Sequence, residues 1–552
     1  MFTSHRFVLL FLSVLILASW AAAEDLLIPA PTTADDYLNA RIVADTSATG
    51  ERADPDRVYV LERDGVYLLN TNIRNAGWTL RMRAQEGSGR KPVIYMVTNT
   101  ATGSFPGQIV DMRGHVWLKD LILVGYIEAL PDEISNIPSG LIRTNAAGFD
   151  LILDGCILTQ SRGQHIRTES ATRKTEIVNC IFANMGDLGL SNFGAGKAID
   201  LRAGSCDSLI MINNTFVNFQ DRIIRHRAST ASINHFIFDH NTLVNGMSYH
   251  GTLALGWVGE DVTITNNLWV DTFIAGNDTD MVRQSEFEES GELDAYGGGR
   301  MTWVITVPND STQYKVAGNY YTVSPAVQAF YDTYASVGVT GEGSPLNWHV
   351  NKKLGADSSL AFIKEDLELA NRPEPMIAMA HWYRSPLGGN KTKSTTNFNR
   401  ATDDYDRRTW QFFSDTLDCT YEVTKAAYTG ALGGFPAGDL NWFPQQKAQW
   451  ENYLTGVEHN RPSVPHQLSL QQNYPNPFNP STRIVFDLAV AGHTTLSVYN
   501  MLGQEVARLI DGKLNPGVHS IAFDAAHLAN GVYLYKLESA NQSVVTKMLL
   551  LK

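Results

Sequence analysis

The sequence predicts an all-β protein in which a solenoid of stacked strands precedes a small β-sandwich. One strand–turn unit recurs through the middle of the chain, and short alternating strands separated by Gly, Asn and Pro turns fill residues 468–552. Copies of a unit that alternates with a period of two indicate strands that stack on one another. The terminal run of short strands is typical of a separate sandwich.

The first 23 residues have the composition of a secretory signal peptide. Arg6 precedes an apolar run over residues 7–20, and three alanines at 21–23 provide a small-residue cleavage site. The run is too short to span a bilayer, and the sequence has no other long apolar run. We therefore expect residues 1–23 to be removed on export, leaving a mature chain without a transmembrane segment.

The repeat occupies the centre of the domain that we expect over residues 24–355. Its strands are rich in Ile, Val and Phe and alternate by two, whereas a helical solenoid would show a period of 3.6. Successive copies are 24, 34, 27 and 26 residues apart, with weaker copies at Asp120 and Asn319. The strongest copies align at Cys156, Cys180, Asn214, Asn241 and Asn267.

Stacking places the aligned residues above one another. With about 4.8 Å between strands, Asn214, Asn241 and Asn267 would form an internal amide ladder, each side chain bonding to the next. An ordinary β-sandwich would not explain such a ladder. Cys156 and Cys180 occupy the same position in earlier copies, and we expect two buried thiols there rather than a disulfide.

A second strand recurs 14 to 17 residues before each aligned position of the repeat. Its inward residues are predicted to be Ile142, Ile166, Ile199, Ile224 and Leu253. Their neighbours then face outward in two files. The first file contains Arg143, Arg167, Asp200 and Arg225. The second contains Asn145, Glu169, Arg202 and Arg227.

These units resemble the right-handed parallel β-helix of the pectate-lyase-like superfamily over roughly residues 55–350. The fold class predicted for the whole chain is therefore all-β, a right-handed parallel β-helix followed by an Ig-like sandwich. Residues 356–460 break the repeat, and we expect an irregular, partly helical cap or flank. Its segment from Gly433 to Pro444 resembles the ending of uncharacterised secreted β-helix proteins.

The arginine-bearing files suggest an anionic polysaccharide as partner, because Arg pairs with carboxylates bidentately. The predicted substrate-binding residues are Arg143, Arg167, Arg202 and Arg222. Glu169, Asp200 and Asp221 are predicted oxygen ligands for Ca²⁺.

The family resemblance implies a lyase that cleaves a uronic-acid glycan by β-elimination. A cation on the sugar carboxylate would acidify the neighbouring proton, and Arg225 or Arg227 would remove it, with Lys197 as a further candidate base. Plain salt bridges between coils would produce the same pattern of charges. The alternative is a non-catalytic glycan-binding or adhesion protein of the cell surface.

The C-terminal residues resemble the sorting domain of type IX secretion cargo. The resemblance rests on the opening Asn473–Pro480, the turn at Leu502–Gly503, the strand at Gly531–Tyr533 and the tail Lys547–Lys552. It implies a domain at 468–552 that the type IX secretion machinery recognises. Residues 461–467 form the predicted Pro-containing linker. A secreted or surface-attached protein is therefore expected, passing through the Sec pathway and then type IX secretion.

Composition excludes several other classes. A formal net charge of −13 offers no basis for nucleic acid as the main partner. Four cysteines are too few for a disulfide scaffold. P-loop, EF-hand and Ser-His-Asp signatures are absent from the sequence, which removes nucleotide-dependent and serine-hydrolase functions from consideration.

Overall fold

The structure, a computed structural model, describes residues 25–125, 140–276, 280–293, 311–337, 361–384, 416–459 and 469–552 apart from short internal gaps, together with residues 354 and 398–399. The predicted signal peptide lies outside the described residues. The chain divides into two compact units, one within residues 11–450 and one within residues 451–552.

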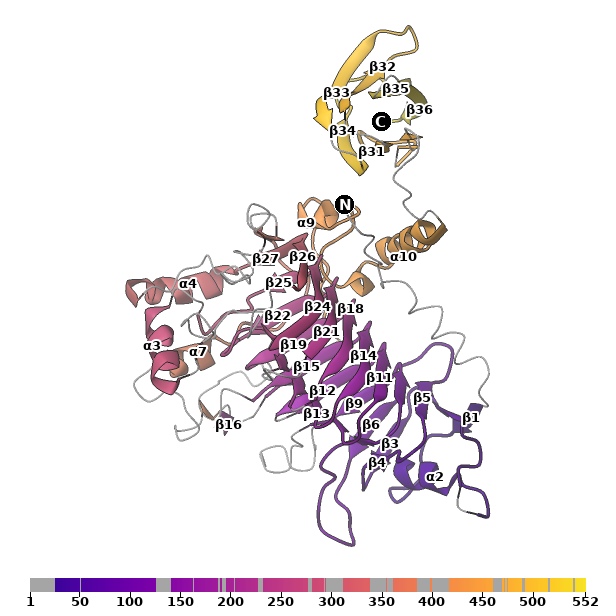
Figure 1. Ribbon diagram of the computed structural model, residues 1–552, viewed down its shortest axis with the longest axis vertical. Helices are drawn as coiled ribbons and strands as arrows, with labels where there is room; N and C mark the ends of the chain where they lie inside the picture. Colours follow the sequence, from indigo (N-terminus) through magenta and orange to yellow (C-terminus); the bar gives the residue numbers. More distant parts are fainter. Residues whose placement is uncertain are drawn as a thin grey trace. The chain divides into compact units, whose positions relative to one another are not determined.

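The first unit is a parallel β-helix, which confirms the predicted architecture. Its three long sheets run side by side along the coil, with every pair of neighbouring strands parallel (Figure 1). The first sheet contains β1 (Asp25–Ile28), β2 (Val58–Leu61), β5 (Leu80–Ala84), β8 (Val116–Lys119), β11 (Phe149–Asp154), β14 (Thr172–Val178), β18 (Cys206–Ile212), β21 (Ser232–Asp239), β24 (Trp257–Thr265) and β26 (Gln313–Ala317).

The second sheet contains β4 (Ile73–Arg74), β7 (Val110–Met112), β10 (Ile142–Thr144), β13 (Gln164–Thr168), β17 (Lys197–Leu201), β20 (Arg222–His226) and β23 (Leu253–Ala254). The third sheet contains β3 (Val66–Leu69), β6 (Val93–Met96), β9 (Ile122–Val124), β12 (Ile157–Ser161), β15 (Ile181–Met185), β19 (Thr215–Phe219), β22 (Thr242–Gly246), β25 (Leu268–Val270), β27 (Asn319–Thr322) and β28 (Phe362–Lys364). The last of these strands lies beyond residue 355, where we expected the repeat to end.

The core runs along the inside of the coil. The predicted inward file is confirmed, because its five members pair in register from strand to strand and are all fully buried. Stacked Phe182 and Phe216 lie in the third sheet, and Phe238 in the first sheet stacks on Phe216. Since each coil repeats the same side-chain positions, the sequence repeat becomes a continuous apolar interior.

The predicted amide ladder is also confirmed. Asn214 Nδ2 donates to Asn241 Oδ1 at 2.9 Å, and Asn241 Nδ2 donates to Asn267 Oδ1 at 3.0 Å. The ladder continues to Asn319 at 2.8 Å. Each of these amides also bonds backbone groups of the adjoining turn, so the buried polar atoms are satisfied within the stack.

A second amide ladder lies within the third sheet, on β15, β19 and β22. Asn218 Nδ2 donates to Asn184 Oδ1 at 3.0 Å, and Asn245 Nδ2 donates to Asn218 Oδ1 at 2.5 Å. All three residues have left-handed backbone, with φ between 54° and 61°. Asn tolerates this conformation better than other residues with a Cβ, and this explains its use where the strand turns.

All four cysteines are buried and free, so the expectation of thiols at Cys156 and Cys180 is confirmed. The two occupy equivalent positions, because Ile157 pairs with Ile181 on neighbouring strands. Cys180 Sγ accepts from the Cys156 backbone N–H at 3.3 Å. The thiol thus takes the place that an Asn oxygen fills higher in the stack.

The described residues outside the three sheets include several helices. The helices are α2 (Leu38–Ala44), α3 (Met281–Ser290), α4 (Pro325–Thr333), η2 (Ala335–Val337), α7 (Ile377–Arg384), α9 (Ala427–Gly430), η5 (Leu440–Trp442) and α10 (Pro444–His459). Strands β16 (Gly189–Leu190) and β29 (Phe398–Asn399) form a small antiparallel pair.

Part of the flank covers the outer face of the third sheet. Tyr421 and Phe443 pack against a cluster that includes Val217, Val244 and Leu268. Hydrogen bonds fix the same segment, since Asp439 Oδ2 accepts from Thr215 at 2.8 Å and the Trp442 indole donates to Thr215 Oγ1 at 2.9 Å, among others. The third sheet is therefore unavailable along this stretch as a binding face.

The second unit is a small antiparallel β domain. One sheet contains β30 (Ser469–Leu470), β31 (Ser481–Leu488) and β34 (Gly517–Asp524), and the other contains β33 (Glu505–Leu514), β32 (Gly492–Tyr499), β35 (Gly531–Ser539) and β36 (Gln542–Leu550). The short strands that the sequence predicts over residues 468–552 form. In strand β33 the side chains are all exposed or half-buried and show no clean alternation.

Candidate functional site

The outer face of the second sheet carries the predicted charged file. Its residues pair in register along the whole sheet, and the file is longer than the sequence predicted. It contains Arg74, Asp111, Arg143, Arg167, Asp200, Arg225 and Ala254, one from each strand from β4 to β23. Because the strands are parallel and in register, these side chains stand on neighbouring rungs about 4.8 Å apart.

A second file lies two residues further along each strand. It contains Arg113, Asn145, Glu169 and Arg202, all half-buried or exposed. Arg227, predicted as the next member and as a candidate base, lies outside the described residues. We call the described members of both files the arginine face. It carries six arginines and three carboxylates, a net charge of +3 on a chain whose formal charge is −13.

The carboxylates of the arginine face are already paired. Asp111 lies 3.2 Å from Arg113 and 3.6 Å from Arg74, and it accepts from Asn145 at 2.6 Å. Asp111 is nearly buried, whereas the Arg74 side chain is 57% exposed. The first carboxylate of the face therefore already has two arginine partners and one amide partner.

The other two carboxylates are paired as well. Asp200 is buried and lies 3.2 Å from Arg225, with Arg202 further away at 3.9 Å. Glu169 pairs with Arg167 at 2.5 Å. The pair Asp200–Arg225 connects two neighbouring coils, whereas the pair Glu169–Arg167 lies within one coil.

Arg143 differs from the other arginines of the arginine face. It is half-buried, and it forms no hydrogen bond or ion pair with any residue that the structure describes. Its neighbour on one side is Asp111, which already pairs with Arg113, Arg74 and Asn145, and on the other side is Arg167. Like charges on directly paired positions repel each other. The arginine face thus contains one place where an added anion would gain two guanidinium partners.

Three predicted site residues lie inside the protein instead. Lys197 Nζ lies 3.0 Å from Asp221, and Arg222 Nε donates to the same carboxylate at 2.8 Å. His250 Nδ1 lies 2.7 Å from the other carboxylate oxygen of Asp221. Asp221 is fully buried, and the side chains of Lys197 and Arg222 are at most 6% exposed.

The electrostatics of this internal cluster follow from burial and pairing. Burial alone would raise the pKa of Asp221, but Arg222, Lys197 and His250 together hold that pKa well below its usual range. Burial lowers the pKa of Lys197, and the attraction of Asp221 only partly offsets it. The predicted roles of Lys197, Arg222 and Asp221 in catalysis, substrate binding and metal binding stay predictions, and the arginine face does not include them.

The three carboxylates predicted to bind Ca²⁺ do not form a common site. Asp200 pairs with Arg225, Glu169 with Arg167, and Asp221 belongs to the internal cluster. Among the described residues, the group of His, Cys, Asp and Glu close enough to share an ion includes none of the three. Calcium binding by these residues therefore stays a prediction without support from their arrangement.

Sequence reasoning missed Arg74, Asp111 and Arg113. The sequence did contain a signal for Asp111 and Arg113. Residues 109–113 repeat the pattern of Leu141–Asn145, in which two apolar residues precede a charged residue and a polar or charged residue follows two positions later. Arg74 stands on a two-residue strand, which is too short for a periodic pattern.

No helix in the described part of the chain combines the length and the apolar composition that a membrane crossing requires. Residues 472–551 match a family model described as the secretion system C-terminal sorting domain. No curated protein and no solved structure matches the chain. The second unit is therefore a type IX secretion sorting domain, and the protein is cargo that this system exports to the cell surface or the extracellular space.

Proposed function

We propose that this exported β-helix protein binds an anionic polysaccharide along the arginine face. The observation that carries the proposal is the pair formed by Arg143 and Arg167. Their positions face each other on β10 and β13, and Arg143 has no partner among the described residues. A carboxylate placed between them would relieve their repulsion and form charge-assisted hydrogen bonds with both.

The shape of the second sheet supports a polymer rather than a small anion. Its strands present equivalent positions at each rung, from Arg74 to Arg225. A chain with a charge on each sugar unit can lie along such a file and contact several rungs at once, and contacts that are weak singly then add through effective concentration. Localisation outside the cell gives the protein access to polysaccharides of this kind.

A lyase is the second candidate function. It is favoured by Arg225, a predicted base that lies on the same face with its side chain 20% exposed. This arginine already pairs with Asp200, so it would have to exchange that partner for a sugar substituent during a reaction. The binding function can begin at Arg143, which has no partner among the described residues, and for this reason we place it first.

Incubation with pectate, alginate and chondroitin, each with and without Ca²⁺, separates the two functions. The binding proposal predicts retention of at least one polymer and no unsaturated products in ultraviolet absorbance. Release of such products, lost in Arg225→Ala but kept in Arg90→Ala, would establish the lyase instead. Arg90 suits as the control because it is exposed and its side chain has no partner among the described residues.

A further inference from the structure

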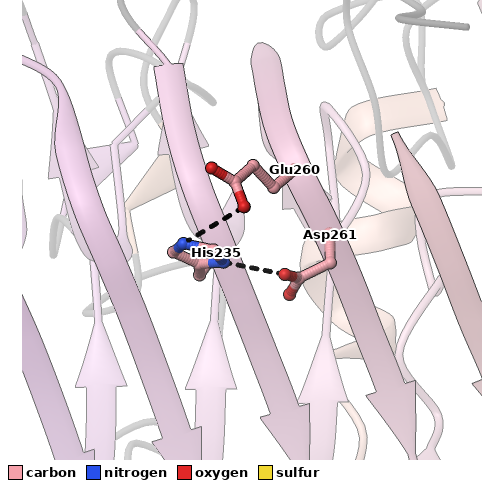
Figure 2. Close-up of side chains that lie close together, drawn as sticks. All are labelled: His235, Glu260 and Asp261. Atoms are coloured by element: carbon pink, nitrogen blue, oxygen red, sulfur yellow. Dashed lines mark hydrogen bonds and ion pairs between the residues drawn. The ribbon is translucent and has the colours of Figure 1, made fainter. Parts of the chain in front are cut away.

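A second group of chemically active side chains lies on the outer face of the first sheet, away from the arginine face. His235 is on β21, and Glu260 and Asp261 are on the neighbouring strand β24 (Figure 2). His235 Nδ1 is 2.7 Å from Asp261 Oδ2, and His235 Nε2 is 3.8 Å from Glu260 Oε2. One potential ligand atom from each residue lies within 4.8 Å of the others. We call these three residues the His235 cluster.

A β-bulge explains why two consecutive acidic residues face the same side. Ile233 pairs with Val258 and His235 pairs with Asp261, so the single residue Asn234 faces two residues of β24. In a regular strand Glu260 and Asp261 would point to opposite faces. The extra residue removes that alternation, and Figure 2 shows both carboxylates turned toward the His235 ring.

Gly259 makes this bulge possible. A Cβ at residue 259 would lie 2.6 Å from the Asn234 side-chain oxygen. Asn234 in turn donates to Asp207 on the preceding strand at 2.9 Å and accepts from Ser232 at 2.7 Å. The bulge is therefore locked by neighbouring side chains, and the position of Glu260 beside His235 is built into the fold.

The charge balance of the cluster differs from that of the rest of the sheet. Elsewhere on this outer face, Asp154 pairs with Lys119 at 2.9 Å and Glu176 pairs with Lys174 at 2.9 Å. Within the described part of the chain, no Lys or Arg forms an ion pair with Asp207, Glu260 or Asp261. The cluster is thus a concentration of negative charge around one imidazole, and no Lys or Arg of the described residues pairs with it.

We propose that the His235 cluster binds a divalent transition-metal cation such as Zn²⁺. His235 Nε2 and the Glu260 carboxylate are the direct ligands, and their separation of 3.8 Å accommodates an ion about 2.0–2.2 Å from each. Asp261 accepts from Nδ1–H and thereby directs the Nε2 lone pair outward, the arrangement found around many metal-bound histidines. Water fills the remaining positions, because Glu260 and Asp261 are 74% and 42% exposed.

The imidazole sets the preferred class of metal. Ca²⁺ takes six to eight oxygen ligands, whereas imidazole nitrogen suits Zn²⁺ and its transition-metal neighbours. An ion bound here would join β21 to β24, and we expect it to stabilise two adjacent coils in addition to neutralising the cluster.

Calorimetric titration of the untagged chain from residue 24, freed of metal by a chelator, tests the site. The probes are ZnCl₂ and CaCl₂. We expect a Zn²⁺ site that is lost in His235→Ala and Glu260→Gln and is weakened about 10- to 100-fold in Asp261→Asn. His493→Ala is the matched control, since His493 forms another histidine–carboxylate pair with Asp511 at 3.3 Å.

Thermal unfolding and circular dichroism distinguish a variant that has lost the metal site from one that has not folded. Zn²⁺ should raise the Tm of the wild-type chain and of His493→Ala but leave that of His235→Ala unchanged, with equal circular dichroism spectra for all three proteins. Unchanged Zn²⁺ binding in His235→Ala, no Zn²⁺ binding by the wild type, or tighter binding of Ca²⁺ than of Zn²⁺ would each overturn the proposal.

Discussion

Arg143 and Arg167 occupy directly paired positions on neighbouring strands, and no carboxylate of the described chain pairs with Arg143. Two strands further along, Asp200 and Arg225 show the opposite arrangement, a buried carboxylate paired with the arginine of the next coil at 3.2 Å. The second sheet therefore carries one arginine that neutralises a buried carboxylate, Arg225, and one that pairs with no described residue, Arg143.

This difference predicts opposite effects on stability. Arg225→Ala should lower the free energy of unfolding by about 1–3 kcal/mol, because it leaves the buried Asp200 without its nearest cation. Arg143→Ala should change it by less than about 0.5 kcal/mol, since it breaks no described contact and removes a repulsion. Urea unfolding followed by fluorescence measures both. Equal losses in the two variants would mean that Arg143 has a structural partner.

The amide ladder should contribute strongly to stability. Asn241→Ala removes the acceptor of the Asn214 backbone N–H and the donor to the Met211 carbonyl, all of them buried. We expect a loss of about 2–4 kcal/mol in urea unfolding. Asn72→Ala, at a half-buried position with no described side-chain bond, is the matched control and should stay within about 0.5 kcal/mol. Similar behaviour of the two variants would contradict the importance of the ladder.

His165 predicts a loss of stability in acid. Its Nδ1 lies 2.6 Å from Ser161 Oγ, and its Nε2 lies 3.0 and 3.1 Å from two carbonyl oxygens, so Nε2 carries a proton that it donates to them. Burial lowers the pKa of His165 to about 4. In the unfolded chain the His165 imidazole therefore takes up a proton near pH 6.5, whereas in the folded chain it does so only near pH 4.

The stabilisation from a neutral His165 is complete above pH 6.5 and is lost as the pH falls from 6.5 toward 4, by up to roughly 3 kcal/mol. Urea unfolding at pH 7.5 and pH 5 measures this change. His165→Gln should be less stable than the wild type at pH 7.5 and should lose less on acidification. If the wild type and His165→Gln lost the same free energy of unfolding between pH 7.5 and pH 5, His165 would be excluded as the source of the loss.

The sorting domain predicts where a truncated protein stops. A chain that ends at residue 467 keeps every described element of the β-helix unit but loses both sheets of the C-terminal unit. It should fold and accumulate in the periplasm, because the type IX system can no longer recognise it. Fractionation with a protease-resistance assay of the truncated chain tests this. Normal amounts of folded truncated protein in the medium would contradict the assignment of the export signal.

The repeat made much of the fold predictable. Asn214, Asn241 and Asn267 recur with the strands that carry them, and stacking then dictates their contacts. The second ladder was equally accessible, since Asn184, Asn218 and Asn245 are separated by the same 34 and 27 residues as Cys180, Asn214 and Asn241. It was missed because the left-handed backbone at these three residues interrupts the alternation of strands β15, β19 and β22.

The site was less predictable for two physical reasons. Lys197 and Arg222 stand two residues before Ile199 and Ile224, so strand alternation turns them to the inward side, which sequence reasoning overlooked. The His235 cluster depends on a bulge, and a bulge reverses the alternation from which side-chain directions are predicted. Whether Arg143 lacks a partner also depends on the pairing of Asp111, which no single strand reveals.

Binding of anionic polysaccharides at low and high salt tests the central claim most directly. The wild-type chain should bind at least one of pectate, alginate and chondroitin, more weakly at high salt, and should not bind neutral dextran. The double variant Arg143→Ala/Arg167→Ala should bind at least about tenfold more weakly, equivalent to about 1.4 kcal/mol, while Arg90→Ala binds as the wild type does. Undiminished binding by the double variant, or no binding of any anionic polymer by the wild type, would contradict the account.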